Sequence, residues 1–317
     1  MIKQTWVLID DNIGNNNQAI ALANKLEYKY ELKKLTYNCF ARLPNFLLFG
    51  SLIQIDKKIL DNFDNLPDLI ISSGRRTAYV AVAIKKRKPS VKIIQIMKPN
   101  LNLKHFDVII IPIHDEFDTS NKKIIRITGA LNDISNRIAK SNIAPVEIKY
   151  PILQFDFIAV IIGGGSKKYN FPEQDELKLL EILIAVQKNN NLPLFISFSS
   201  RTNSAIKKKI IEKFSKYPIY DPKQDSLNPY IFMITKAKFV ICTGDSISMC
   251  SEVASVGRPL YIFMPNSFKS CKHRRFYLDL ISKNIAKPLT SLTKKLTEYS
   301  YDPLDESKKI VNQISLF

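Results

Sequence analysis

Glycine, cysteine and long apolar runs are all scarce in this sequence. Only nine of the 317 residues are glycine, so the places where glycines cluster are informative. The four cysteines form no CxxC pair and show no metal-like spacing with the three histidines, which disfavours a zinc site and indicates reduced thiols. The longest apolar stretch near the N-terminus, residues 46–55, is too short to cross a bilayer. No signal peptide is visible either, so we expect a cytoplasmic protein. From the cysteine and histidine spacing we expect no bound metal, and we expect no cofactor.

Acidic residues are also few relative to basic ones. The sequence holds 47 lysines and arginines against 29 aspartates and glutamates, a formal net charge of +18. Such a surplus can reflect an anionic partner, such as nucleic acid, an acidic membrane surface or a diphosphate substrate. It can also reflect, and here we favour, a codon bias in which lysine replaces neutral surface residues along the whole chain. The basic residues are spread along the chain without a nucleic-acid-binding motif, so we expect no nucleic-acid partner. Weak attraction to an anionic membrane surface is the expected by-product of this charge.

Strand-like and helical patterns alternate along the whole chain. Apolar runs without polar alternation, typical of strands covered on both faces, lie at residues 6–9, 69–72, 92–96, 108–111, 157–162, 194–197, 239–242 and 260–263. Helical patterns lie between them, and this order predicts parallel sheets with crossover helices. The same scheme begins at Trp6 and again at Phe157. We therefore predict an α/β protein with two doubly wound, Rossmann-like domains that face a central cleft.

The expected domain boundaries follow from a break in this pattern. Residues 142–154 contain two prolines and no helical period, so they are the candidate linker. We expect an N-terminal Rossmann-like domain over residues 1–145 and a C-terminal one over residues 150–300. The last segment, residues 301–317, contains an amphipathic helix that is expected to pack back on the N-terminal domain.

Residues 239–263 combine a buried strand, a polar turn, a short helix over residues 247–256 and a second buried strand. On that helix Ser248 and Glu252 lie one turn apart and share a polar face. The free N–H groups at the helix start can bind a phosphate, and the glutamate can accept hydrogen bonds from sugar hydroxyls. This layout suits a nucleotide-diphosphate site, although strand–turn–helix units also occur in α/β proteins without such a function.

Small and polar residues follow other predicted strands of the second half. The strand at residues 157–162 is followed by Gly163, Gly164, Gly165 and Ser166. This run is neither a Walker loop nor a GxGxxG fingerprint, so ATPase and dinucleotide-binding functions lose support, but it suits a diphosphate. After the strand at residues 194–197, Ser199 and Arg201 add a hydroxyl and a cation. Asn228 opens a later helix and could place an aromatic ring or a backbone amide beside a nucleobase.

Two loops of the first half also carry candidate binding residues. Asp11 and Gly14 follow the first strand, where the glycine either brings backbone close to a ligand or simply forms a turn. Arg75 and Arg76 stand directly after a glycine turn at a helix start. A pair of guanidinium groups in that position can bind an anion.

A third loop holds the candidate acid–base residues. His114 is the only histidine in a loop at the carboxyl end of a predicted strand, and Asp115 lies beside it. A carboxylate next to a histidine can tune the histidine pKa, so His114 could act as a general base. A purely structural histidine fits the sequence equally well.

Several motifs follow one another in order along the chain. They are GN–Q at 14–18, SGRRT at 73–77, IPIHDEF at 111–117, TGALNDIS at 128–135, GGGSKKYNF at 163–171, NPY at 228–230 and TGDSISMCSEVASVGRP at 243–259. With these motifs the chain resembles the mitochondrial-fission Elm-type family over nearly its full length. It is also similar to the second half of GT-B glycosyltransferases and to the nucleotide-sugar 2-epimerases.

The resemblance implies roles for the residues of the second half. Glu252 would hold the ribose hydroxyls, and Ser246 with its neighbouring amides would hold the diphosphate. Asp245 and Ser248 belong to the same expected donor site, which the glycine loop would line. GT-B transferases generally need no bound metal, because helix dipoles and cations offset the charge of the leaving diphosphate. The chain departs from the family at Ser200, where an arginine is usual, and this departure puts the strength of donor binding in doubt.

The function implied by the resemblance is sugar transfer from a nucleotide-diphosphate donor to a cell-envelope acceptor, such as a lipid-linked one. Arg75, Arg76 and His114 would face the acceptor, with His114 or Asp115 as the base. One alternative is a nucleotide-sugar epimerase of the same fold, and another is a non-catalytic, membrane-associated adaptor. Residues 40–49, hydrophobic and partly basic, could dock on the inner face of a membrane or form a buried loop instead.

Overall fold

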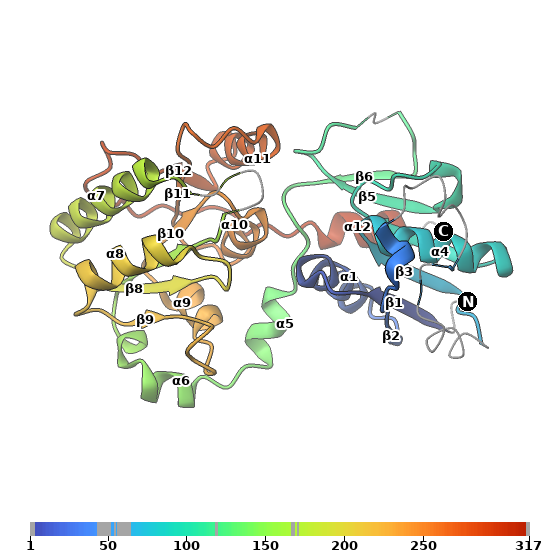
Figure 1. Ribbon diagram of the computed structural model, residues 1–317, viewed down its shortest axis with the longest axis horizontal. Helices are drawn as coiled ribbons and strands as arrows, with labels where there is room; N and C mark the ends of the chain where they lie inside the picture. The colour runs from blue at the N-terminus through green and yellow to red at the C-terminus, as the bar shows by residue number, and fades with distance from the viewer. Residues whose placement is uncertain are drawn as a thin grey trace. The chain divides into compact units, whose positions relative to one another are not determined.

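The computed structural model describes residues 4–42, 52–53, 55, 65–117, 120–165, 169 and 171–314 of the chain. The chain forms two units, the first made of residues 1–133 and 305–317 and the second of residues 134–304. It passes from the first unit to the second after Asp133 and returns after Leu304. Figure 1 labels the helices and strands of both units.

The first unit is built on a six-stranded parallel sheet with the order β2-β1-β3-β4-β5-β6. Its strands are β1 (Thr5–Ile9), β2 (Tyr30–Lys34), β3 (Leu69–Ser73), β4 (Lys92–Ile96), β5 (Val108–Pro112) and β6 (Ile124–Ile127). The strand order changes direction at β1, since β2 lies on one side of it and β3 on the other. The carboxyl ends of β1 and β3 therefore border the switch point at which open α/β sheets bind ligands.

Helices cover both faces of the first sheet. They are α1 (Ile13–Leu26), α4 (Arg75–Arg87) and α12 (Ser307–Ile314), with short 3-10 turns at η1 (Cys39–Arg42) and η2 (Leu103–His105). Trp6 and Ile70 pack on one face in the same cluster as the buried residues of α4. The alternate residues Val7 and Ile71 pack on the other face with α1 and with Ile310 of α12. The C-terminal helix therefore completes the core of the first unit, beside α1 (Figure 1).

The second unit repeats the scheme with the strand order β12-β11-β10-β7-β8-β9, again all parallel. Its strands are β7 (Ile158–Ile162), β8 (Leu194–Phe198), β9 (Ile219–Tyr220), β10 (Phe239–Thr243), β11 (Leu260–Phe263) and β12 (Ala286–Pro288). Its helices are α5 (Ile134–Ala139), α6 (Ala144–Lys149), η3 (Pro151–Gln154), α7 (Glu173–Asn190), α8 (Ser204–Phe214), α9 (Tyr230–Lys236), α10 (Ile247–Ala254) and α11 (Cys271–Ser282). Here the switch point lies between β7 and β10.

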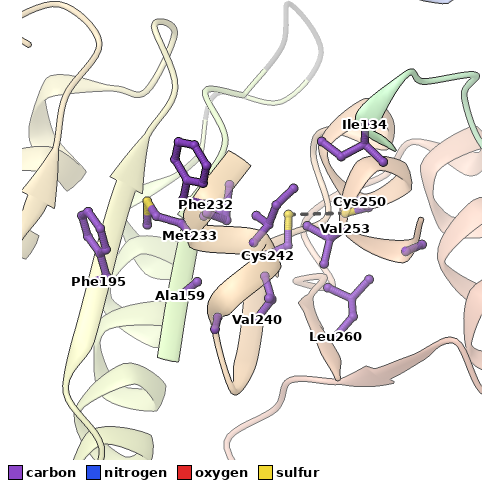
Figure 2. Close-up of a cluster of buried hydrophobic side chains, with 14 of the residues drawn as sticks. Ile134, Ala159, Phe195, Phe232, Met233, Val240, Cys242, Cys250, Val253 and Leu260 are labelled. Atoms are coloured by element: carbon purple, nitrogen blue, oxygen red, sulfur yellow. Dashed lines mark hydrogen bonds between the residues drawn. The ribbon is translucent and has the colours of Figure 1, made fainter. Parts of the chain in front are cut away.

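Strand β7 shows how the second core is divided between the two faces of its sheet. Ile158 and Val160 point to the face covered by α7 and α8, whereas Ala159 points to the face covered by α9, α10 and α11. Figure 2 shows part of the latter cluster, where Cys242 at the end of β10 meets Cys250 of α10. Their sulfur atoms are 3.5 Å apart, and both thiols are free and buried.

Every apolar run that the sequence predicts as a strand is a strand in the structure, so the predicted fold class is confirmed. The strands that the pattern misses are β2, β6, β9 and β12, and all of them lie at sheet edges. An edge strand has one neighbour and an open flank, so its side chains need not be apolar. Strand β2, with the sequence YELKK, has no fully buried residue.

Two local predictions differ from the structure. Residues 142–154, expected as an unstructured linker, form α6 and η3 inside the second unit. Their prolines occupy the first turns of these helices, where a missing N–H costs nothing because it would have no intrahelical partner. The chain passes between the units earlier, after Asp133. Gly14, placed by the sequence in the loop after the first strand, either near a ligand or in a simple turn, lies in the first turn of α1, which begins at Ile13.

Candidate functional site

The glycine run after β7 is held by side chains that follow β10. The N–H of Gly163 donates to Thr243 Oγ1 at 2.7 Å, and the N–H of Gly165 donates to Asp245 Oδ2 at 2.9 Å. A Cβ added at Gly163 would lie 2.3 Å from both oxygens of Asp245, and Gly165 has a positive φ of 68°. Both positions therefore require glycine, and the loop presents backbone groups at the switch point between β7 and β10.

The loop after β8 packs against the same glycines. Thr202 Oγ1 donates to the carbonyls of Ile162 and Gly163 at 3.0 and 2.9 Å, and it accepts from the Ser199 N–H at 2.8 Å. A Cβ added at Gly164 would lie 2.3 Å from the backbone carbon of Arg201, so the two loops touch along their backbones. Thr202 and Thr243 thus set the shape of the glycine loop.

Helix α10 begins directly beside this loop. Ser246 is the N-cap, and its hydroxyl accepts a hydrogen bond from the Met249 N–H. The preceding residue, Asp245, is buried, and its Oδ1 accepts no hydrogen bond from any residue that the structure describes. His273 of α11 lies near Asp245, and burial lowers the pKa of His273 below its ordinary value. The helix start therefore combines backbone N–H groups that have no acceptor within the helix with a carboxylate oxygen that can accept a further hydrogen bond.

Glu252 lies further along α10 and is held by two other helices. Its Oε1 accepts a hydrogen bond from Arg137 Nη1 of α5 at 2.8 Å, and its Oε2 accepts one from the Tyr230 hydroxyl of α9 at 2.8 Å. The carboxylate side chain is 14% exposed. Burial and the nearby charge of Glu252 raise the pKa of Tyr230 well above its usual range, so this hydroxyl stays a donor.

The first unit contains a pocket of about 1080 Å³ at the carboxyl ends of β1, β2 and β3, lined by both charged and apolar side chains. Its lining includes three of the predicted acceptor-side residues, Asp11, Arg75 and Arg76. Arg76 is bound by two carboxylates, at 3.1 Å from the buried Asp10 and by a closer contact to Asp11. Its guanidinium also stacks over the Tyr37 ring at 4.7 Å. The guanidinium of Arg76 is therefore already paired with two carboxylates of its own chain.

The other predicted residues lie in varied surroundings. His114 is only 4% exposed, and Asp115 beside it is half-buried in a turn closed by its N–H to the Pro112 carbonyl. A Cβ added at Gly14 would meet only Asn12 Oδ1, at 3.6 Å, so local packing does not demand glycine there. Asn228 is exposed, and its Oδ1 accepts a hydrogen bond from the Tyr230 N–H. Ser248 and Arg201 are exposed as well, and Ser166 lies outside the described residues.

The sequence does not reveal which residues hold this site together. Thr243 begins the motif at 243–259 and Thr202 follows Arg201, but nothing in the sequence marks either threonine as a partner of the glycine loop. Arg137 lies more than a hundred positions from Glu252 in the chain, and only the packing of α5 on this unit brings them together. Tyr230 lies in the NPY motif, which identifies it as a candidate but not as a partner of Glu252.

Two doubly wound parallel sheets of this kind define a Rossmann-like protein of the GT-B type. The chain is similar to UDP-GlcNAc 2-epimerase from Methanocaldococcus jannaschii, with a TM-score of 0.61, 11% identity and coverage of 99% of this chain and 100% of that one. It is also similar to UDP-GlcNAc 2-epimerase from Neisseria meningitidis bound to UDP-GlcNAc, with a TM-score of 0.56, 13% identity and 99% coverage of both chains. At such identities the likeness concerns the fold alone.

The sequence matches the Mitochondrial fission ELM1 family over residues 13–316, and the chain belongs to this family. An uncharacterized protein of Rickettsia prowazekii (strain Madrid E) is 42% identical over 98% of this chain and 97% of its own length. The mitochondrial fission protein ELM1 of Arabidopsis thaliana is 22% identical over 78% of this chain, which spans 63% of that protein. The resemblance read from the ordered motifs is confirmed. Within the part of the chain that the structure describes, no helix is long and apolar enough to cross a membrane.

Proposed function

We propose that this protein binds a nucleoside-diphosphate sugar at the carboxyl edge of its second sheet and transfers the sugar to a cell-envelope acceptor. The observation that carries the proposal is the arrangement at the switch point between β7 and β10. A glycine loop, the start of α10 and the carboxylate of Glu252 all belong to this edge of one unit. The start of α10 offers backbone N–H donors for a diphosphate, the glycine loop lets that group approach closely, and the carboxylate of Glu252 can accept from sugar hydroxyls.

In this proposal each predicted donor residue has a chemical task. The backbone of Gly163, Gly164 and Gly165, with Ser166, lines the diphosphate, and the N-cap region of Ser246 supplies N–H donors. The spare Oδ1 of Asp245 accepts a hydroxyl of the donor sugar. Ser199, Arg201, Asn228 and Ser248 lie at the rim and contact the remaining polar groups. No metal is invoked, because the helix start and nearby cations carry the charge of the leaving diphosphate.

The acceptor side of the proposal lies in the first unit. The pocket that contains Asp11, Arg75 and Arg76 supplies a surface of mixed charged and apolar groups for the acceptor, with Gly14 in the adjoining first turn of α1. His114 or Asp115 serves as the base. Asp115 is the more exposed of the two, so its replacement by asparagine is expected to reduce turnover more than His114→Gln does.

An epimerase function is the second candidate, and the solved relatives favour it. Proteins of the same fold with TM-scores of 0.61 and 0.56 are UDP-GlcNAc 2-epimerases. The family also contains a mitochondrial fission protein, which supports an adaptor function at a membrane as a third candidate. Residues 40–49 are the proposed membrane contact; residues 43–49 lie outside the described part of the chain. Product analysis separates the candidates, because a transferase releases free nucleoside diphosphate, an epimerase yields an altered sugar nucleotide, and an adaptor yields neither.

Calorimetry and thermal shift with UDP-, GDP-, CMP- and dTDP-sugars test the donor site directly. A ligand that binds only the folded state stabilises it, by about 2.7 kcal/mol at one hundred times its dissociation constant. We expect one nucleotide class to stabilise the protein and Glu252→Ala to lose that stabilisation. Glu147→Ala is the matched control, because Glu147 pairs with Lys236 on the surface of the same unit. The proposal fails if no nucleotide stabilises the protein or if Glu252→Ala is stabilised as strongly.

A further inference from the structure

A second pocket, of about 620 Å³, lies between the starts of α7 and α8 in the second unit. These two helices lie beside each other (Figure 1) and cover the face of the second sheet opposite to the one that α10 covers. The pocket is therefore separate from the start of α10 and from Glu252. Its walls include the rings of Tyr169 and Phe171 together with Pro172 and Ala205. No step of the proposed sugar transfer uses this pocket.

Two glutamates of α7 and one lysine of α8 supply the charged groups of the pocket. Lys209 Nζ donates to Glu176 Oε2 at 2.9 Å and to Glu173 Oε1 at 3.0 Å. These hydrogen bonds raise the pKa of Lys209, so its ammonium group stays charged. The described lining thus carries two negative charges and one positive charge, in a chain whose net charge is +18. This local excess of negative charge favours a cation as the ligand.

Glu176 is the buried member of this group. Its side chain is only 3% exposed, whereas those of Glu173 and Lys209 are 75% and 27% exposed. Its Oε2 accepts from Lys209, and its Oε1 accepts no hydrogen bond from any residue that the structure describes. A buried carboxylate oxygen without a donor costs free energy. Because Glu176 lines the pocket, a donor placed in the pocket can reach that oxygen.

The wall of the pocket is held in place by the buried Asp175. The Tyr169 hydroxyl donates to Asp175 Oδ2 at 2.9 Å, and the Ser267 hydroxyl donates to the same oxygen. The Tyr169 ring packs edge-on against Phe171 and Phe268, with ring centroids 5.4 and 4.4 Å apart. The wall therefore presents fixed apolar surface, which suits the organic part of a small molecule.

The donor set distinguishes an organic ammonium from a metal ion. Mg²⁺ and Ca²⁺ take six or more oxygen ligands. Over the residues that the structure describes, no group of three or more Asp, Glu, His or Cys could hold a metal ion. An ammonium group instead donates three hydrogen bonds and needs fewer acceptors. Lys209 shows that Glu173 and Glu176 already accept an ammonium group from within the chain.

We infer that this pocket binds a small organic cation that bears a primary ammonium group, with Glu176 Oε1 as its main acceptor. The apolar part of the cation packs against Tyr169 and Phe171, and Glu173 adds a second negative charge near the ammonium group. This binding site goes beyond the proposed sugar transfer and does not depend on it.

Ligand-observed NMR and calorimetry with n-butylammonium chloride test the inference on the full chain, and n-butanol is the neutral probe of the same chain length. The wild-type protein is expected to bind n-butylammonium and not n-butanol. Glu176→Gln keeps the size of the side chain but removes its charge, so binding should weaken about tenfold. Ala205→Leu, at an exposed position of the lining, fills part of the pocket and should weaken binding without changing any charge.

Glu212→Gln is the matched control, because Glu212 lies further along α8 in an exposed pair with Lys208. It is expected to bind n-butylammonium as the wild type does. Absence of binding to the wild type, equally strong binding of n-butanol, or unchanged binding by Glu176→Gln overturns the inference. Thermal unfolding checks that each variant is folded. If Glu176→Gln is not, unchanged binding by Ala205→Leu overturns the inference instead. Nucleotides are absent from these experiments, so a negative result leaves the proposed function to its own test.

Discussion

Gly163 and Asp245 lie so close that a single added carbon atom at Gly163 would stand 2.3 Å from each carboxylate oxygen of Asp245. The contact joins the loop after β7 to the turn after β10, across the switch point of the second sheet. Asp245 can approach because position 163 has no side chain, and its Oδ2 then accepts the Gly165 N–H. The carboxylate is therefore an integral part of the glycine loop.

Gly163→Ala is expected to destabilise the protein by about 2 kcal/mol, because inserting a methyl group into a packed contact forces its neighbours to move. Nucleotide binding should weaken as well, since the loop and Asp245 shift together. Denaturant unfolding and calorimetry measure the two effects. Adding Asp245→Ser to Gly163→Ala shortens the opposing side chain and should recover part of the stability.

Gly257→Ala is the control for this prediction. Gly257 follows α10 with a positive φ of 79°, so alanine there costs about 1 kcal/mol of stability through backbone strain. The position is remote from the glycine loop along α10, and nucleotide affinity should not change. If Gly163→Ala leaves stability and binding at wild-type values, the close contact with Asp245 does not exist in solution.

Arg76→Gln is expected to destabilise the first unit by about 2 kcal/mol, because it leaves the Asp10 carboxylate buried without its cation. The Asp10 side chain is 2% exposed, whereas that of Arg76 is 31% exposed, so solvent offsets part of the loss. Combining Arg76→Gln with Asp10→Asn should restore much of the stability. Lys34→Gln, at an exposed position in the same pocket, should change stability little. If the double mutant loses as much free energy of unfolding as the two single mutants together, Arg76 and Asp10 are not coupled.

Asp107→Asn is expected to reduce stability at neutral pH and to matter less in acid. Burial by itself raises the pKa of Asp107, but hydrogen bonds from Lys85 and from the Ile93 N–H outweigh it and lower the pKa below its ordinary 3.8. The stability gained from the lowered pKa is thus complete above pH 3.8 and is lost as the pH falls below it. Urea unfolding of both proteins at neutral and acidic pH measures this difference.

The surface pair of Lys208 and Glu212 supplies a comparison for Asp107. The Glu212 side chain is 64% exposed, so Glu212→Gln should leave the pH dependence as in the wild type. If the difference in the free energy of unfolding between the wild type and Asp107→Asn is the same at neutral and acidic pH, the lowered pKa of Asp107 is contradicted.

The cysteines are expected to react with a maleimide in two classes. Cys39 and Cys271 are exposed and should be labelled rapidly in the native protein. The hydrogen bond with Cys250 and burial raise the pKa of the Cys242 thiol, so little reactive thiolate forms there. Mass spectrometry of peptides from briefly treated protein should find Cys242 and Cys250 unlabelled, and treatment in urea should label all four cysteines. Labelling of Cys242 at the rate of Cys39 would show that the β10–α10 core opens readily.

The strands of both sheet interiors are predictable from the chain because they are covered on both faces. Residues 158–162 and 239–242 are apolar throughout, and such runs are recognisable from the sequence without knowledge of the neighbouring strands. The start of α10 is equally local, since a turn and an N-cap serine mark it. Edge strands such as β2 are not recognisable in this way, because only their pairing makes them strands.

The features of the candidate site also fall into two groups, those that local sequence reveals and those that depend on tertiary packing. The sequence alone determined the alternating fold, the glycine loop and the place of Glu252 on a helix, because each depends on neighbours within a few residues. Only the tertiary structure decided that Asp245 supports the glycine loop, that Arg76 is paired with Asp10, and that Arg137 holds Glu252. The members of each pair are far apart in the chain, and their interaction depends on distances set by the packed sheets and helices.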